Sequence, residues 1–148
     1  MAHLGSTRHP LRLRLQGGNL GLETSNSAEL IRHIERGFRF KALQALESRS
    51  GLAVSRLASI LGIPERTLAR RKASGRLSPD ESERLLRISS IFDDAVNLFE
   101  GDVGSAVKWL TTPRKALGNQ PPLAYSRTEL GALEVESLIG RLEHGIFS

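Results

Sequence analysis

The stretch VSRLASILGIPERTLARRKA, residues 54–73, decides the fold of this chain. Leu57 and Leu61 fall on one face of a predicted first helix, and Gly62 follows where a turn needs a residue that tolerates positive φ. Pro64 then opens a second helix at a position where its missing N–H costs nothing. Two helices joined by a short glycine-containing turn are typical of a helix-turn-helix, whose second helix can lie in a DNA major groove. The pattern therefore predicts double-stranded DNA as a partner.

The second helix of this motif divides into an inner and an outer face. Leu68 is expected to face the core, and Ile63 to fill the angle between the two helices. Arg71 stands where such motifs usually carry an apolar residue, so we expect its stem to cover the edge of the core while its head reaches outward. The side chains that we expect to contact DNA are Arg56, Glu65, Arg66, Thr67, Arg70, Arg71 and Lys72.

Charge is distributed unevenly along the chain, whose formal net charge is +5. Residues 51–77 hold six Lys/Arg and one acid, whereas residues 78–148 hold seven Lys/Arg and eleven acids. A basic block that coincides with a helix-turn-helix favours phosphate neutralisation, because that effect is local. The ordinary alternative for a charge run is a solvated helix face.

Length and composition restrict the class of protein. The 148 residues fit one domain, or two small ones that share a core. The absence of cysteine excludes disulfides, a thiol nucleophile and a cysteine-based zinc site, and it suits the cytoplasm, our predicted location. No run approaches the ~20 apolar residues of a membrane span, so we expect no membrane contact. Residues 1–26 are predicted to be a mostly disordered basic arm, with a transit peptide as the weaker alternative.

Capping signals and apolar spacing predict an all-α fold without strands. Residues 27–77 are predicted to form a helical DNA-binding part, and residues 78–148 a second helical part that shares its core. The segment at residues 114–127 is predicted to be a loop, in which the prolines at 121 and 122 stiffen the chain. The expected helices cover residues 26–37, 40–51, 54–62, 64–75, 78–101, 102–113 and 128–145.

No catalytic or metal site is predicted. The histidines are not spaced like a metal-binding pair, no serine lies in a G-x-S-x-G turn, and the adjacent Asp93 and Asp94 do not face each other on a helix. We therefore expect neither an enzyme nor a cofactor.

The chain from about Ala53 to its end resembles the antitoxins of the Xre–MbcA–ParS type found in RES–Xre toxin–antitoxin pairs. Each matching element is weak alone, but their order over most of the chain is specific. Gly118-Asn119 departs from a frequent Gly-Gly, and Tyr125 replaces a frequent aliphatic residue. The elements are LSPDESERLLRISSIF (77–92), Ala106, Trp109, Leu110, Pro113, residues 116–118 and 121–123, Thr128, Gly131, Val135 and residues 138–145.

The resemblance implies a dimerising antitoxin within a larger hetero-oligomer. Its partner would be a RES-type toxin that consumes NAD⁺, its C-terminal region would cover the toxin's active site, and its helix-turn-helix would repress the shared operon by binding the promoter. The expected toxin contacts are Leu138, Arg141, Leu142, Glu143, His144, Ile146, Phe147 and Ser148.

Several alternatives stay open at this point. The chain could be a dimeric helix-turn-helix transcription regulator without a toxin partner. Trp109 is expected in the core, with a direct partner contact as the alternative. Ile146 and Phe147 are apolar residues after a helix-stopping glycine, which dock either on this chain or on a partner. The homodimer is expected to form mainly through the helix at residues 79–99 and its neighbours. The second face of that helix carries Leu86, Ile91 and Leu98.

Overall fold

The computed structural model describes residues 20–22 and 26–145, and every regular element in that part of the chain is helical. The predicted all-α class is confirmed, with a helix-turn-helix followed by a second helical part. The elements are α2 (Ser27–Arg36), α3 (Phe40–Ser50), α4 (Val54–Leu61), α5 (Glu65–Ser74), α6 (Pro79–Leu98), α7 (Val103–Leu110), the 3₁₀ helix η3 (Lys115–Leu117), α8 (Pro122–Tyr125) and α9 (Glu129–Glu143).

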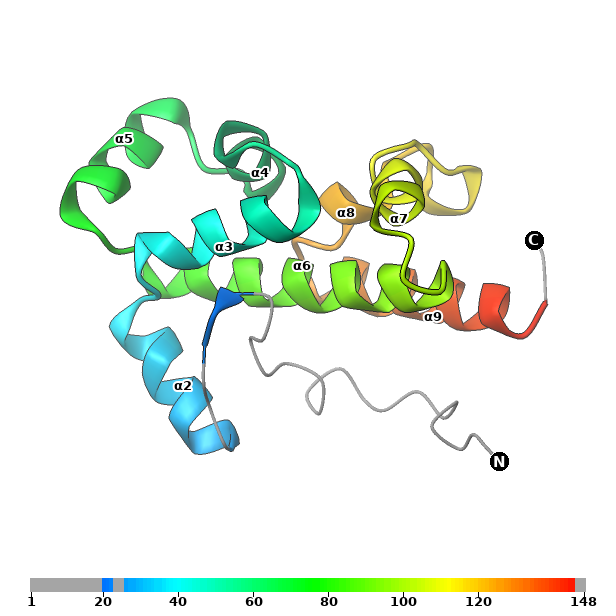
Figure 1. The fold of residues 1–148 in the computed structure, drawn as a ribbon, viewed down its shortest axis with the longest axis horizontal. Coiled ribbons are helices and arrows are strands. Elements are labelled where there is room, and N and C mark those ends of the chain that lie inside the picture. Colours follow the sequence, from blue (N-terminus) through cyan, green and yellow to red (C-terminus); the bar gives the residue numbers. More distant parts are fainter. Residues whose placement is uncertain (1–19, 23–25, 146–148) are drawn as a thin grey trace.

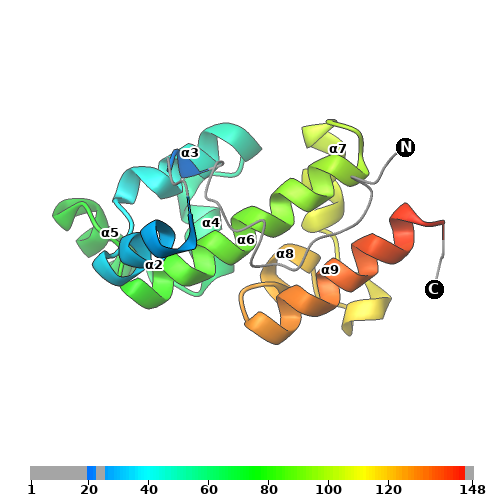
Figure 2. The same ribbon diagram turned by 90° about the horizontal axis from the view of Figure 1, so that it is seen from below.

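The long helix α6 is the axis of the molecule (Figure 1). The helices α2 to α5 gather around its first half, and α7 and α8 lie over its second half. Figure 2 shows α9 running beside α6, with the last turn of α9 at the end of the molecule opposite α5. The helix α5 and the last turn of α9 therefore lie at opposite ends of the molecule.

The start of α6 is fixed by a capping box. Ser78 Oγ accepts a hydrogen bond from the Glu81 amide at 3.1 Å, and Glu81 Oε1 accepts one from the Ser78 amide at 2.8 Å. Twelve residues of α6 are buried, because helices pack on several of its faces.

This packing corrects the predicted dimer surface. Leu86 and Ile91 are 3% and 0% exposed and Leu98 is half-buried, so the second apolar face of α6 lies in the chain's own core. The sequence showed that α6 is apolar on two sides, but neighbours of the same chain cover both of them. A homodimer would have to use another surface.

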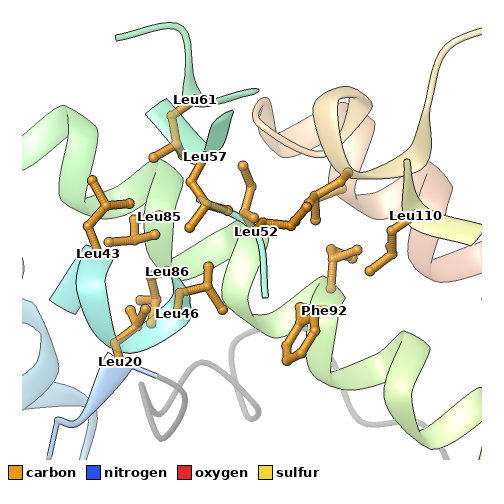
Figure 3. Close-up of a cluster of buried hydrophobic side chains, with 14 of the residues drawn as sticks. Leu20, Leu43, Leu46, Leu52, Leu57, Leu61, Leu85, Leu86, Phe92 and Leu110 are labelled. Atoms are coloured by element: carbon orange, nitrogen blue, oxygen red, sulfur yellow. The ribbon is translucent and has the colours of Figure 1, made fainter. Parts of the chain in front are cut away.

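A single cluster of buried apolar residues runs through both halves (Figure 3). Leu57 and Leu61 of α4, Leu85 of α6 and Leu110 of α7 all belong to it. It also includes Leu20, which is 2% exposed and had been assigned to the disordered arm at residues 1–26. At Leu20 that assignment is wrong, because a leucine beside the apolar side of α3 and α6 gains more from burial than from hydration. The rest of the expected arm up to residue 19 lies outside the described residues.

The link between α2 and α3 pairs with the link between α5 and α6. The Leu77 amide donates to Phe38 O at 2.9 Å, and the Phe40 amide donates to Gly75 O at 2.8 Å. Gly37 makes this pairing possible: its φ is +87°, and a Cβ at this position would lie 2.2 Å from the Leu77 carbonyl oxygen. The two ends of the DNA-binding part are thereby held together.

The prediction that residues 114–127 form a loop is wrong in part. It contains the short helices η3 and α8, and the Pro122 and Leu123 side chains are buried. A four-residue helix is too short to produce a periodic apolar pattern, so the sequence did not indicate it. Trp109 is 8% exposed, which confirms its expected place in the core.

Candidate nucleic-acid interface and partner surface

The turn between α4 and α5 has the predicted geometry. Gly62 lies in the left-handed region (φ 79°, ψ 27°), and the following amide, that of Ile63, donates to Ala58 O at 2.8 Å. Ile63 is 4% exposed and fills the angle between the helices, as expected. Pro64 is the N-cap of α5 rather than its first residue, and its missing N–H leaves no unpaired donor in either position.

Most of the predicted DNA contacts face solvent. Arg66 and Arg70 lie one turn apart and therefore share a face of α5. Thr67 is half-buried, and Leu68 is half-buried and packs against the core. Such a face can offer guanidinium groups both to phosphates and to base edges. The exposed members of the predicted set are Arg56, Glu65, Arg66, Arg70 and Lys72.

Arg71 is placed differently from the prediction. The residue is half-buried, and its head turns toward α6 instead of reaching outward. Arg71 Nε donates to Glu81 Oε1 at 2.8 Å, and Arg71 Nη2 donates to Glu81 Oε2 at 3.0 Å. A buried carboxylate within reach is a stronger partner for the guanidinium than bulk water.

Burial alone would raise the pKa of Glu81, since it disfavours the charged form. Hydrogen bonds from Arg71 and from the Ser78 amide outweigh burial and hold the pKa of Glu81 below its ordinary value. In turn, the hydrogen bond to Glu81 raises the pKa of Arg71. Both groups are therefore charged near neutral pH.

A residue of the C-terminal half also reaches the helix-turn-helix. Arg127 Nη1 donates to Ile60 O at 3.4 Å, near the end of α4, and the Arg127 carbonyl accepts a hydrogen bond from Arg87 of α6. Sequence reasoning missed Arg127 and Glu81. Their partners are distant in the chain or on another helix, and no local spacing signals such pairs.

The predicted toxin contacts are divided among three environments. Leu138 is 5% exposed and belongs to the core, so its side chain holds α9 on its own chain and offers no surface to a partner. Arg141 and Leu142 are half-buried, and Glu143 and His144 are exposed. Ile146, Phe147 and Ser148 lie outside the described residues.

Two apolar side chains of α9 that sequence reasoning did not select face solvent. Leu130 is 74% exposed and Leu133 is 46% exposed. They lie three residues apart and so share one face of the helix. A helical pattern alone could not show which leucines of α9 face the core, because the helix carries apolar residues on several sides.

Residues 20–22 and 26–145 contain no group of three His, Cys, Asp or Glu side chains that could hold a metal ion. In the same residues, every helix falls short of the length and apolarity that a membrane-spanning helix needs.

Comparison with known proteins places this architecture in a family. Over 130 residues the chain is 42% identical to a protein named Antitoxin Xre from Yersinia enterocolitica serotype O:8, and this alignment covers 87% of this chain and 88% of that protein. The chain belongs to the Xre antitoxin family. It is also similar to proteins named Antitoxin Xre from Photorhabdus laumondii, at 35% identity over 130 residues, and from Pseudomonas putida, at 31% identity over 138 residues. These two alignments cover 87% and 93% of this chain, and 88% and 85% of those proteins.

Two domain families divide this Xre antitoxin between them. The antitoxin Xre-like helix-turn-helix domain matches residues 29–90, and the antitoxin Xre/MbcA/ParS C-terminal toxin-binding domain matches residues 94–145. The first includes α4 and α5, and the second includes α7, α8 and α9. The resemblance seen in the sequence is confirmed, and none of these matches is described by a catalytic activity.

Proposed function

We propose that this Xre antitoxin neutralises a RES-type, NAD⁺-consuming toxin by binding over its active site, and represses its own operon through α5. The observation that carries the proposal is that one chain matches a helix-turn-helix domain and a toxin-binding domain in succession. The toxin-binding match argues against the alternative of a transcription regulator without a toxin partner. The NAD⁺ chemistry rests on the resemblance to RES–Xre pairs.

The end of the chain is the proposed inhibitory element. A site for NAD⁺ must offer cationic or polar groups to a pyrophosphate, and carboxylates at Glu143 and at the terminus could occupy such a site. Glu143 and His144 are exposed at the end of α9. Leu142 packs against the core and would anchor this end of the helix.

The test is co-expression with a RES-type toxin encoded beside this gene, with growth and cellular NAD⁺ as readouts. The full chain should restore both. Removal of residues 143–148 should weaken or abolish the rescue while leaving DNA binding nearly intact, because the removed segment is terminal and short. Rescue by the truncated chain would show that inhibition comes from another surface, and a Leu130→Ser/Leu133→Ser variant then tests the exposed face of α9.

The DNA half of the proposal has its own test. Arg66→Ala and Arg70→Ala should weaken binding to the operon's upstream DNA by ~1–3 kcal/mol where a bidentate base contact is lost. Arg32→Ala is the matched control, because Arg32 is an exposed arginine of α2, which lies away from α5 (Figure 1). If both α5 variants bind as the wild type does, α5 is not the recognition helix.

A homodimer completes the proposal. One helix-turn-helix reads a single half-site, and a second copy supplies the other about one DNA turn away. Sedimentation at micromolar concentration, with and without toxin, should reveal the dimer. A monomer under both conditions would remove this part of the proposal.

A further inference from the structure

The helix α5 is held only loosely by packing. None of its residues is buried, although α3, α4 and α6 each bury several. A cleft of about 380 Å³ lies between α5 and the helices α3 and α4, and Phe40, Val54 and Leu68 are among its lining residues. Apolar contacts alone therefore leave the angle of α5 poorly fixed.

The turn at Gly62 holds the first residues of α5, and Arg71 holds its last turn. The two parallel hydrogen bonds from Arg71 to Glu81 fix direction as well as distance, because the guanidinium and the carboxylate are both planar. Within residues 65–74, no other side chain makes an ion pair or hydrogen bond to a different helix in the described part of the chain.

The carboxylate that receives these two hydrogen bonds is buried and has a further partner on its own helix. Glu81 is 6% exposed, and the capping box ties both its side chain and its amide to Ser78. Arg71 therefore connects the last turn of α5, a helix with no buried residue, to α6, which has twelve.

We propose that Arg71 and Glu81 are positioning residues that set the angle at which α5 enters the DNA groove, and that Arg71 does not contact phosphate. The proposal rests on the DNA binding proposed above. In this proposal the exposed Arg66 and Arg70 contact the DNA. The Arg71–Glu81 ion pair orients the helix that carries them.

A positioning role and a simple charge effect predict opposite changes in DNA affinity when Glu81 is replaced. A carboxylate close to a DNA-binding helix repels phosphate, so its removal should strengthen binding if charge alone mattered. If Glu81 positions α5, its removal should weaken specific binding although the protein becomes more positive.

The decisive variants are Glu81→Gln and Arg71→Lys, measured on the operon's upstream DNA and on a scrambled duplex. Glutamine still completes a capping box but offers no second anionic oxygen. Lysine keeps the charge of Arg71 but lacks its fork. Each variant should bind the specific DNA roughly tenfold more weakly, which corresponds to one misaligned arginine–base contact. Binding to the scrambled duplex, and the dependence of that binding on salt, should not fall.

Glu83→Gln is the matched control, because Glu83 is an exposed acid only two residues further along α6. It removes the same charge and should leave the ratio of specific to scrambled binding unchanged. Circular dichroism and toxin neutralisation check that each variant is folded. Should Glu81→Gln fail to fold, Arg71→Lys decides alone, since it changes a residue outside the buried core.

The outcomes separate the two levels of the argument. If the wild-type protein shows no preference for the upstream DNA, the proposed repressor function fails. If the wild type is selective and both variants bind as tightly or more tightly, the positioning role is overturned while the function stands. If Arg71→Lys loses the same affinity for both duplexes and its binding depends less steeply on salt, Arg71 is a phosphate contact. That result would also overturn the inference.

Discussion

Two buried serines of α6, Ser82 and Ser90, differ in what their hydroxyls do. Ser82 Oγ donates to Ser78 O at 2.7 Å and accepts from the Phe38 amide at 2.8 Å. Ser90 Oγ is buried without a hydrogen-bond partner among the described residues. The cost of losing a hydroxyl depends on the partners left behind, so these two sites should respond in opposite ways.

Ser82→Ala should lower the free energy of unfolding by about 1–3 kcal/mol, because it leaves the buried Phe38 N–H without an acceptor. Ser90→Ala should be neutral or slightly stabilising, since it removes a buried oxygen that has no partner. Urea denaturation of both variants checks the pair. Equal losses at the two sites would contradict the hydrogen-bond argument.

Gly37 allows a comparison of backbone strain with steric overlap. Gly37→Ala should destabilise the protein by about 2 kcal/mol or more, since the new Cβ would overlap the Leu77 carbonyl and also meet a strained φ. Gly51 has a similar φ of +81° but open space around it, so Gly51→Ala should cost only about 1 kcal/mol. Thermal denaturation of the two variants separates the contributions, and similar losses would argue against the close approach.

At the scale of the elements, the link between α5 and α6 should titrate. The pKa of Glu81 is lowered relative to an ordinary value of 4.5, so its ionised form stabilises the fold. That contribution is complete above the unfolded-state pKa and disappears as the pH falls through the lower, folded-state pKa.

The advantage of the wild type over Glu81→Gln in free energy of unfolding should therefore be largest near neutral pH. It should shrink as the pH falls below 4.5 and through the lower, folded-state pKa of Glu81. Denaturation of both proteins across this range gives the difference directly. A difference that stays constant with pH would mean that the carboxylate charge contributes nothing to stability.

The sequence predicted those features whose signal lies within a few neighbouring residues, and it did not predict contacts between different helices. Ser78, Asp102 and Thr128 cap their helices, and the sequence can indicate such caps because a capping side chain and its target amide are three residues apart. The helix α8 was missed because it is shorter than one apolar repeat, and the Arg71–Glu81 pair was missed because it joins two helices. Exposure on α9 was misjudged because Leu130 and Leu138 look alike in a sequence.

At the scale of the whole molecule, one cluster of buried side chains extends from α2 to α9. The helix α6 contributes to it along its length, with α2 and α4 packed on it as well as α7 and α9. Neither half therefore has a separate core. The sequence analysis predicted this, since it expected the two parts to share one core.

The full chain should unfold in one cooperative transition, with equal calorimetric and van't Hoff enthalpies. A fragment ending at residue 90 should not fold, because it would expose residues of α6 that α7 and α9 normally cover. Calorimetry of the chain and circular dichroism of the fragment are the measurements. Two separate transitions, or a cooperatively folded fragment, would show that the halves are independent.

The two domain families meet between residues 90 and 94, and both positions lie inside α6. Ile91 and Phe92, which lie between the matched segments, are 0% and 1% exposed. The boundary between the two matched domains therefore lies inside α6, the helix with the most buried residues. Recombination at that boundary would join two halves of α6 whose buried side chains come from different proteins and are not matched to each other. Lineages of such antitoxins should therefore inherit the helix-turn-helix domain and the toxin-binding domain together.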